Sequence, residues 1–348
     1  MAALVATGCG GSGAGKSQRA DGGAASEAGG GTSVGGPALA AGYTMTTVYA
    51  GTPTAYGPMA IDATSAYFVV EDPNAGEDVV QVPLAGGSAI VLATNANDFG
   101  GGFALDDSDL YWPDFGNGGK GPDGGATTPD GEVMRVPLTG GTASAVVTGT
   151  SASAVAVDDA NVYWSDLLAG TLSAVPKGGG AATVLASGQS GVQEIALDAT
   201  QVYWLTNDSA GIAWLRTVPK SGGTPTKLAE YECTGRSFAL HGGFVYWTCG
   251  GNVMRTPVAG GATTTLALEQ ASFEGQLAVD DTAVYWATVD GTVVKLPSAA
   301  GLEGATPTVL YSPNSPETNV YNATSVAVDA TGLYVLLYGG TLAKISSP

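Results

Sequence analysis

Polar side chains that could bind a ligand recur at one position of a motif that the chain repeats seven times. Glu194 and Glu274 offer carboxylates that could hold a divalent metal, and Arg236 offers a cation. Each lies just before an apolar-Ala-apolar stretch, so a repeat protein would gather them at one mouth of a central channel. We predict a ligand-binding ring there, made of Gln193, Glu194, Arg236, Glu274, Gln276 and Asn322. The alternative is that these side chains solvate the mouth or pair with one another.

The single histidine limits the enzyme classes open to the chain. Metal-dependent lyases and hydrolases on channel mouths typically cluster His with Asp or Glu, and one His cannot form a His cluster. His241 replaces the Asp that follows the apolar-Ala-apolar stretch in the other six copies. Those aspartates are expected to accept hydrogen bonds from the turn that follows, so we interpret His241 as a turn variant. No catalytic residue is predicted.

A metal could instead be held in the long Gly-rich segment 114–131. Asp114, Asp123 and Asp130 supply the oxygen ligands that Ca²⁺ prefers, although their spacing matches no EF-hand. A solvated loop without a metal is the simpler interpretation. We therefore predict no cofactor, with Ca²⁺ as the ion to test.

Residues 10–17 match the P-loop pattern letter for letter. A P-loop works only when a helix follows it, because the helix N-terminus helps to hold the phosphate. Here the chain continues in Gly, Ala and Ser to about residue 42, a composition that does not nucleate a helix. We interpret residues 10–42 as a disordered tether rather than a nucleotide site.

The motif belongs to a longer unit that the whole of residues 43–348 repeats. A Tyr follows each apolar-Ala-apolar stretch, and successive copies of this Tyr are 39 to 52 residues apart, the spacing of four-stranded blades. In five copies the next residue is Trp. Because neighbouring residues of a strand point to opposite faces, we predict that Tyr packs in one blade interface and Trp in the other. The repeat tyrosines are Tyr67, Tyr111, Tyr163, Tyr203, Tyr246, Tyr285 and Tyr334.

The second half of each unit reads as two more strands. One ends in Val-Pro, and a Gly-Gly pair then permits the positive φ of a tight hairpin before a Thr-x-Leu-Ala strand. The last copy ends without this fourth strand, whereas residues 47–51 resemble one. We predict an all-β, seven-bladed β-propeller of four-stranded blades, closed by an N-terminal strand that completes the last blade.

The phrases Val162-Tyr163-Trp164-Ser165-Asp166 and Val202-Tyr203-Trp204-Leu205-Thr206 resemble YWTD-type repeats. The whole unit is similar to the NHL-like and YWTD-like propellers of secreted proteins over about residues 44–348. This resemblance implies the fold and leaves the function open, because such propellers include receptors, scaffolds, lactonases and lyases. The count of seven differs from the six blades usual for YWTD domains.

The three cysteines fit an exported protein. Cys9 lies in a segment that resembles the lipobox of bacterial lipoproteins, so we interpret residues 1–9 as a truncated signal and Cys9 as the lipidation site. A free thiol is the alternative. Cys233 and Cys249 flank a predicted hairpin that turns at residues 241–243, and counting outward from the turn brings them opposite each other. We predict a disulfide between them, which an export compartment permits.

The charge excludes some partners. With 31 acidic and 12 basic residues, the chain has a formal charge of −19, which argues against nucleic-acid binding and against any membrane contact except through a lipid anchor. We hypothesise a monomeric, non-catalytic binding or scaffolding propeller, extracytoplasmic in the cell envelope or secreted. It would recognise a protein, peptide or glycan through its loop face, where the connections between blades lie. The alternative is a lactonase- or lyase-like enzyme with a carboxylate-held divalent metal at the channel mouth.

Overall fold

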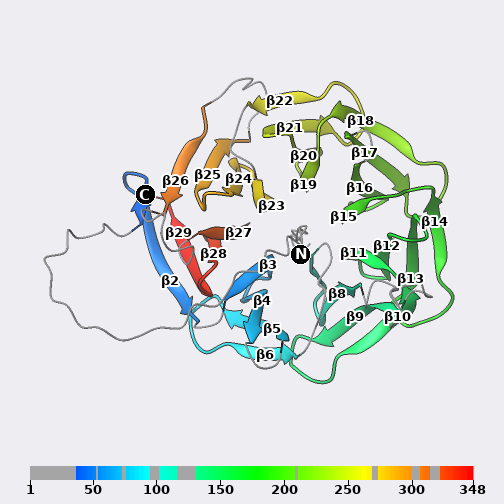
Figure 1. The fold of residues 1–348 in the computed structure, drawn as a ribbon, viewed down its shortest axis with the longest axis horizontal. Helices are drawn as coiled ribbons and strands as arrows, with labels where there is room; N and C mark the ends of the chain where they lie inside the picture. Colours follow the sequence, from blue (N-terminus) through cyan, green and yellow to red (C-terminus); the bar gives the residue numbers. More distant parts are fainter. Residues whose placement is uncertain are drawn as a thin grey trace, which may run out of the picture.

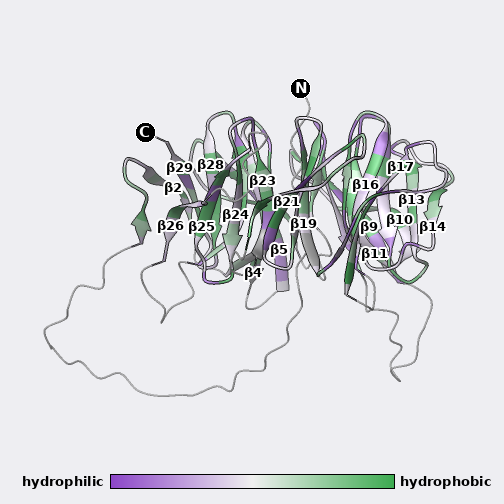
Figure 2. Cartoon of the chain, turned by 90° about the horizontal axis from the view of Figure 1, so that it is seen from above, coloured by the Kyte–Doolittle hydropathy of each residue, from purple (hydrophilic) through white to green (hydrophobic). Residues whose placement is uncertain are grey.

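The computed structural model describes residues 37–51, 54–72, 76–94, 102–115, 130–207, 211–268, 273–298, 306–313 and 322–347. These residues form seven antiparallel sheets arranged in a ring (Figure 1). Seen edge-on, the ring is a disc whose strands run between two faces (Figure 2). No helix occurs within the described ranges, so none there could span a membrane. The predicted seven-bladed propeller is confirmed.

Each blade has four strands, which we call a to d from the channel outward. Blade 1 contains β3 (Ala55–Ile61), β4 (Ser65–Asp72), β5 (Gly76–Pro83) and β6 (Ile90–Ala93). Blade 2 contains β7 (Ala104–Leu105), β8 (Asp109–Asp114), β9 (Gly131–Pro137) and β10 (Ser144–Thr150). Blade 3 contains β11 (Ala152–Val157), β12 (Asn161–Asp166), β13 (Thr171–Pro176) and β14 (Thr183–Ser187).

The other four blades follow the same order. Blades 4 and 5 contain β15 (Val192–Leu197), β16 (Gln201–Asn207), β17 (Ile212–Pro219) and β18 (Thr226–Glu232); and β19 (Gly235–His241), β20 (Phe244–Cys249), β21 (Asn252–Pro257) and β22 (Thr264–Ala267). Blades 6 and 7 contain β23 (Phe273–Val279), β24 (Ala283–Thr288), β25 (Val293–Pro297) and β26 (Thr308–Ser312); and β27 (Ala323–Asp329), β28 (Gly332–Leu337), β29 (Thr341–Ser346) and β2 (Thr44–Ala50).

The core lies between blades and is built from the Tyr-Trp pairs, as predicted. Tyr163 of blade 3 shares a buried cluster with Trp204 of blade 4, and Tyr203 of blade 4 shares the next with Trp247 of blade 5. Burying a large side chain of this kind contributes about 2–3 kcal/mol, and a lone blade could not bury both faces. The ring therefore folds as a closed set of mutually covered sheets.

The N-terminal segment pairs with two blades and closes the ring at one of them. Strand β2 pairs antiparallel with β29, with Thr47 opposite Ala343, which confirms the predicted completion of the last blade. A second strand, β1 (Ala38–Leu39), was not predicted and adds a fifth strand to blade 6 by pairing with β26. The segment thus contacts two neighbouring blades before the repeats begin.

The two faces of the disc differ in their connections. The turn face carries the a–b and c–d turns, and the loop face carries the b–c and d–a connections. The predicted disulfide between Cys233 and Cys249 is present near the loop face of blade 5, with Cα atoms 5.5 Å apart. Cys9, the tether up to residue 36 and Asp123 lie outside the described residues.

Candidate functional site

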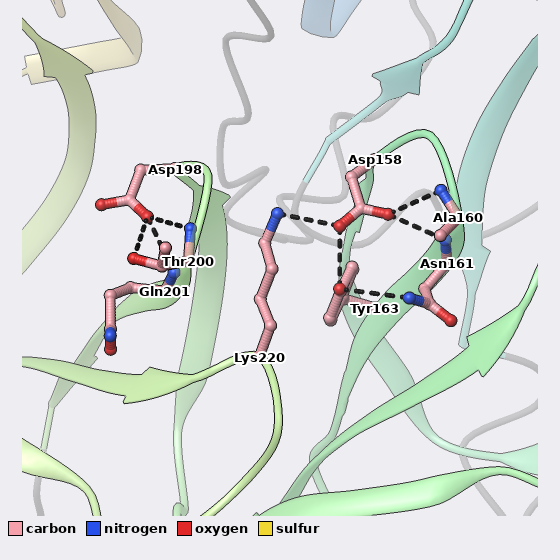
Figure 3. A network of polar contacts seen from close by, with 8 residues as sticks. All are labelled: Asp158, Ala160, Asn161, Tyr163, Asp198, Thr200, Gln201 and Lys220. Atoms are coloured by element: carbon pink, nitrogen blue, oxygen red, sulfur yellow. Dashed lines mark hydrogen bonds and ion pairs between the residues drawn. The ribbon is translucent and has the colours of Figure 1, made fainter.

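The turn face is built from an aspartate at the end of strand a that organises the a–b turn. In blade 3, Asp158 Oδ1 accepts the backbone N–H groups of Ala160 and Asn161 at 2.9 and 2.8 Å. Its Oδ2 accepts the hydroxyl of Tyr163 at 2.8 Å (Figure 3). This Asx turn satisfies two donors that the hairpin leaves unpaired and fixes the tyrosine ring in the interface.

The same unit recurs around the ring. In blade 4, Asp198 accepts the N–H groups of Thr200 and Gln201, both at 2.7 Å, and the hydroxyl of Tyr203 at 2.6 Å. In blade 7, Asp329 accepts turn N–H groups while the tyrosine hydroxyl lies 3.0 Å from a threonine hydroxyl. The remaining copies that bind a tyrosine hydroxyl are Asp62 with Tyr67, Asp106 with Tyr111 and Asp280 with Tyr285.

Two of these aspartates also bind a lysine from the following blade. Lys177 Nζ lies 2.7 Å from Asp106 Oδ2, and Lys220 Nζ lies 2.8 Å from Asp158 Oδ2 (Figure 3). Both lysines follow a Val-Pro pair at the end of strand c, which brings the c–d turn of one blade against the a–b turn of the previous one. These ion pairs link blade 2 to blade 3 and blade 3 to blade 4.

The surroundings keep these carboxylates ionised. Partial burial alone would raise the pKa of Asp106, but hydrogen bonds from Lys177 and from the turn N–H groups outweigh it and lower the pKa to about 2. The pKa of Asp158 is lowered to about 2 in the same way, with Lys220 as the main opposing donor. Burial and then Asp158 raise the pKa of Tyr163 to about 12. Asp106 and Asp158 are therefore anions at neutral pH.

A cavity of about 760 Å³ opens at the centre of the turn face. Its apolar wall includes Ile61, Val279 and Val328, which end the strands a of blades 1, 6 and 7. The ionisable part of the wall consists of carboxylates and the single histidine, and Thr64 and Thr282 also line it. The ionisable residues are Asp62, Asp106, Asp107, Asp280, Asp281, Asp329 and His241.

Blade 5 departs from the pattern. Gly242 and Gly243 have φ angles of 57° and 81°, so they form the tight hairpin turn without a side-chain acceptor. His241 Nε2 instead lies 2.8 Å from Oδ1 of the almost fully exposed Asp281 in blade 6. With no aspartate in its own blade, the Tyr246 hydroxyl donates to the backbone oxygen of Ser298 at 3.2 Å.

The predicted ring residues lie toward the loop face, at the opposite end of the channel from this cavity. Glu194 is 1% exposed, and its Oε2 accepts the N–H of Phe238 in blade 5 at 2.9 Å. Gln276 is equally buried, and its Oε1 accepts the Ser325 hydroxyl of blade 7 at 3.3 Å and the Met59 N–H of blade 1 at 3.4 Å. These two side chains therefore connect different blades.

Of the remaining four, only Asn322 has a described side chain. It is half-buried, and its backbone oxygen accepts the N–H of Tyr338 at 2.9 Å. The side chains of Gln193, Arg236 and Glu274 lie outside the described part, so ligand binding by the ring stays a prediction. Neighbouring hydroxyls act as Glu194 does: Ser153 donates to Val192 O at 2.8 Å, and Ser237 accepts from Leu277 N at 3.0 Å.

The calcium candidates are only partly described. Asp114 ends β8 and pairs in register with Glu132, and Asp130 is exposed just before β9. Within the part of the chain that the structure describes, no group of three or more His, Cys, Asp or Glu side chains could hold a metal ion. Calcium binding by the segment between them stays untested.

Sequence reasoning did not find the cavity or the lysines that pair across blades. The only signal was the phrase Val-Pro-Lys, which occurs at 175–177 and at 218–220. Recognising the pairing requires knowing that the c–d turn lies against the preceding a–b turn. That relation comes from how the blades are packed.

Comparison with known proteins indicates the fold. Neither a family model nor a curated protein matches the chain. A catalytically inactive histidine-to-alanine variant of virginiamycin B lyase from Staphylococcus aureus, with quinupristin, has a TM-score of 0.65 at 9% identity, covering 88% of this chain and 99% of that one. A streptogramin B lyase structure has a TM-score of 0.63 at 10% identity over 87% and 97% of the two chains. BamB from Moraxella catarrhalis has a TM-score of 0.56 at 15% identity over 87% and 98%.

Proposed function

We propose that the chain is a non-catalytic binding or scaffolding propeller that works outside the cytoplasm and recognises a peptide segment of a partner protein. The observation that carries this proposal is the turn-face cavity, which joins an apolar wall to a carboxylate rim. Concave sites of this size with a few polar groups are the usual form of binding sites. The sequence favours the loop face for recognition, whereas the cavity favours the turn face.

The rim carboxylates are suited to attraction rather than to proton transfer. A general base works best when its pKa lies near the working pH, whereas the pKa of Asp106 is lowered to about 2, and the pKa values of Asp62 and Asp280 are lowered as well. The oxygens of these three wall residues also accept hydrogen bonds that hold the turns. Such carboxylates attract Lys or Arg side chains, and the apolar wall suits the aliphatic parts of the same segment.

The proposed location rests on the cysteines. The disulfide in blade 5 is of the kind that persists in oxidising compartments. Attachment to a membrane through a lipid on Cys9 remains part of the proposal. Acylation of Cys9, measured by mass spectrometry of the full chain expressed in a bacterial host, would support it, and unmodified soluble protein would oppose it.

The test of binding is a peptide array probed with the full chain. Peptides rich in Lys or Arg next to apolar residues should bind, and their acidic counterparts should not. Asp107→Lys reverses one exposed charge in the cavity wall and should weaken binding about tenfold. The matched control is Asp159→Lys, an exposed charge of the same face that is not among the residues lining the cavity.

The array separates the proposal from its rivals. Equal weakening by both lysine variants would indicate attraction by net charge alone. Binding that neither variant affects would move the site to the loop face and to the ring that the sequence predicts. Binding to glycans and not to peptides, measured on a parallel glycan array, would show that the ligand is a glycan and not a peptide.

An enzyme remains the second candidate because one observation favours it. His241 lies in the cavity wall 2.8 Å from Asp281, an arrangement in which a carboxylate can orient an imidazole as a base. The lyases of similar fold make streptogramin lactones the first substrates to try. Metal-dependent turnover that His241→Ala abolishes would favour the enzyme, as would loss of turnover in Glu194→Gln or Glu274→Gln. No turnover with added divalent ions would favour binding.

A further inference from the structure

Blade 5 lacks the aspartate that ends strand a in the other blades, but it keeps the tyrosine that donates to this aspartate elsewhere. Tyr246 is 3% exposed and occupies the same register position as the tyrosines whose hydroxyls donate to aspartate in other blades. Its own blade supplies His241 where the others supply a carboxylate. The donor is therefore present without its usual acceptor.

Arg255 adds a buried cation to the same place. It pairs in register with Tyr246 and is 6% exposed. Its Nη1 donates to Ser298 O at 3.1 Å, and its guanidinium lies 4.4 Å from the centre of the Phe244 ring. Its Nε is buried with no acceptor, and no carboxylate of the described residues lies within ion-pair distance. A buried guanidinium without a counter-ion is unusual because desolvating the charge is costly.

Equivalent cations in two other blades face a tyrosine that binds a carboxylate. In blade 2, Arg135 pairs in register with Tyr111, whose hydroxyl donates to Asp106 at 3.0 Å. In blade 6, Lys295 Nζ lies 5.6 Å from the ring centre of Tyr285, whose hydroxyl donates to Asp280. Blades 2 and 6 thus combine a cation, a tyrosine and a carboxylate, whereas the position facing the tyrosine holds Gln81, Ala174 and Thr217 in blades 1, 3 and 4. Blade 5 retains the cation and the tyrosine without the carboxylate.

We propose that Tyr246, Arg255 and His241 form a notch that binds a carboxylate of the ligand at the interface of blades 5 and 6. The bound carboxylate takes the role that aspartate has in the other blades: it accepts from the unpaired Nε–H of Arg255 and replaces Ser298 O as the acceptor of the Tyr246 hydroxyl. Charged hydrogen bonds of this kind are stronger than neutral ones, and arginine binds carboxylates with two parallel bonds. The inference rests on the proposed function, because the notch adjoins the same cavity.

The notch lies one layer behind the cavity wall. Ser298, which holds both Arg255 and Tyr246, contacts two wall residues: its hydroxyl donates to Asp281 O at 3.0 Å and its N–H to Thr282 O at 3.0 Å. His241 itself lies in the wall, held by the exposed Asp281. An entering carboxylate competes with Asp281 for the imidazole and moves it aside to reach the guanidinium.

The charges of the wall define the kind of ligand. Apart from His241, the ionisable side chains that line the cavity are aspartates, so a second acidic group on the ligand would be repelled. A single carboxylate next to neutral or cationic groups fits both parts of the site. The chemistry points to the free C-terminal carboxylate of a peptide whose preceding residues are apolar or basic.

The test follows two side-chain signals by NMR in the full chain. N-acetylglycine is the probe, and N-acetylglycinamide at equal ionic strength is its uncharged control. The Arg255 Nε–Hε and His241 imidazole signals should shift saturably with the carboxylate and not with the amide. The absence of a saturable shift, or equal shifts with both probes, would overturn the proposal.

Two variants check where the probe binds. His241→Asp supplies the carboxylate within the chain and should weaken probe binding at least tenfold in a folded protein. His241→Asn is the matched control for the charge: it also loses the imidazole but adds no carboxylate, so it should bind the probe more tightly than His241→Asp does. Undiminished binding by His241→Asp would contradict the notch. Since the probe carries no basic group, failure here leaves the binding of basic peptides at the rim testable by the array.

Discussion

Blades 3 and 5 build the same a–b hairpin with different interactions. In blade 3 the turn is held by Asp158, which connects two N–H groups, Tyr163 and Lys220. In blade 5 the turn is a Gly-Gly hairpin, and the other end of the same two strands is joined by the disulfide. One hairpin is fixed at the turn face by side-chain hydrogen bonds, and the other at the loop face by a covalent bond.

The comparison shows which parts of a repeat are free to vary. The backbone register of the two hairpins is alike, with the alanine of strand a opposite the tyrosine of strand b in both. What changes is the acceptor at the turn. Because the Gly-Gly turn does not need the carboxylate, blade 5 can lose it, and the tyrosine and the arginine then share the backbone oxygen of Ser298 as their acceptor.

Breaking the disulfide should produce the largest effect. The cysteines are 16 residues apart, and a loop of that size restricts the unfolded chain by about 3 kcal/mol. Replacing both cysteines by serine should lower the unfolding free energy by that amount in urea titrations. Reductant should reproduce the loss in the parent chain and have no effect on the variant. A change below about 1 kcal/mol would show that packing alone holds the hairpin.

Removing an aspartate from a regular blade should have the next largest effect. Asp198→Ala removes the acceptor of two N–H groups and one hydroxyl, so we expect a loss of about 2 kcal/mol. His241→Ala is the matched change in blade 5 and removes only a contact to an exposed carboxylate, for a loss below about 1 kcal/mol. Thermal unfolding of both variants measures the difference. Equal losses would mean that the aspartates are not what holds the regular turns.

Acid should weaken the regular blades. The folded pKa of Asp106 and of Asp158 is lowered to about 2, so the stability that each contributes is present above the unfolded pKa of about 3.9 and is lost as the pH falls through 2. After allowance for solvent screening, the loss is about 1 kcal/mol each. Unfolding free energies measured from pH 6 to pH 2 should show this fall, and Lys177→Met with Lys220→Met should make it shallower. An unchanged slope in that double variant would exclude the lysines as its cause.

The repeat made most of the fold predictable. The Tyr-Trp phrases, the Gly-Gly turns and the incomplete last copy predicted seven blades, the closing strand β2 and the disulfide. Strand β1 could not be predicted, because two residues are too short to show a period. It forms because the edge of β26 has unpaired backbone groups that an adjacent segment can use.

The candidate site was less predictable because it depends on side-chain placement. Glu194 was expected in a loop before strand a, but β15 begins at Val192 with a register shift between Val192 and Glu194. Glu194 therefore lies within strand β15, and its buried carboxylate accepts the N–H of Phe238 in the next blade. The absence of a carboxylate beside Arg255 among the described residues was equally hidden, because it depends on His241, 14 positions earlier in the chain.

The smallest effect should come from returning the carboxylate to blade 5. His241→Asp places an acceptor near Tyr246 and Arg255, and we expect the unfolding free energy to rise by about 1 kcal/mol. The gain is less than the loss from Asp198→Ala because the Gly-Gly turn already satisfies the backbone. Urea titrations of the parent, His241→Asp and His241→Asn separate the charge from the loss of the imidazole. If His241→Asp destabilises the chain as much as His241→Asn, the aspartate does not reach the donors and the two turns are not interchangeable.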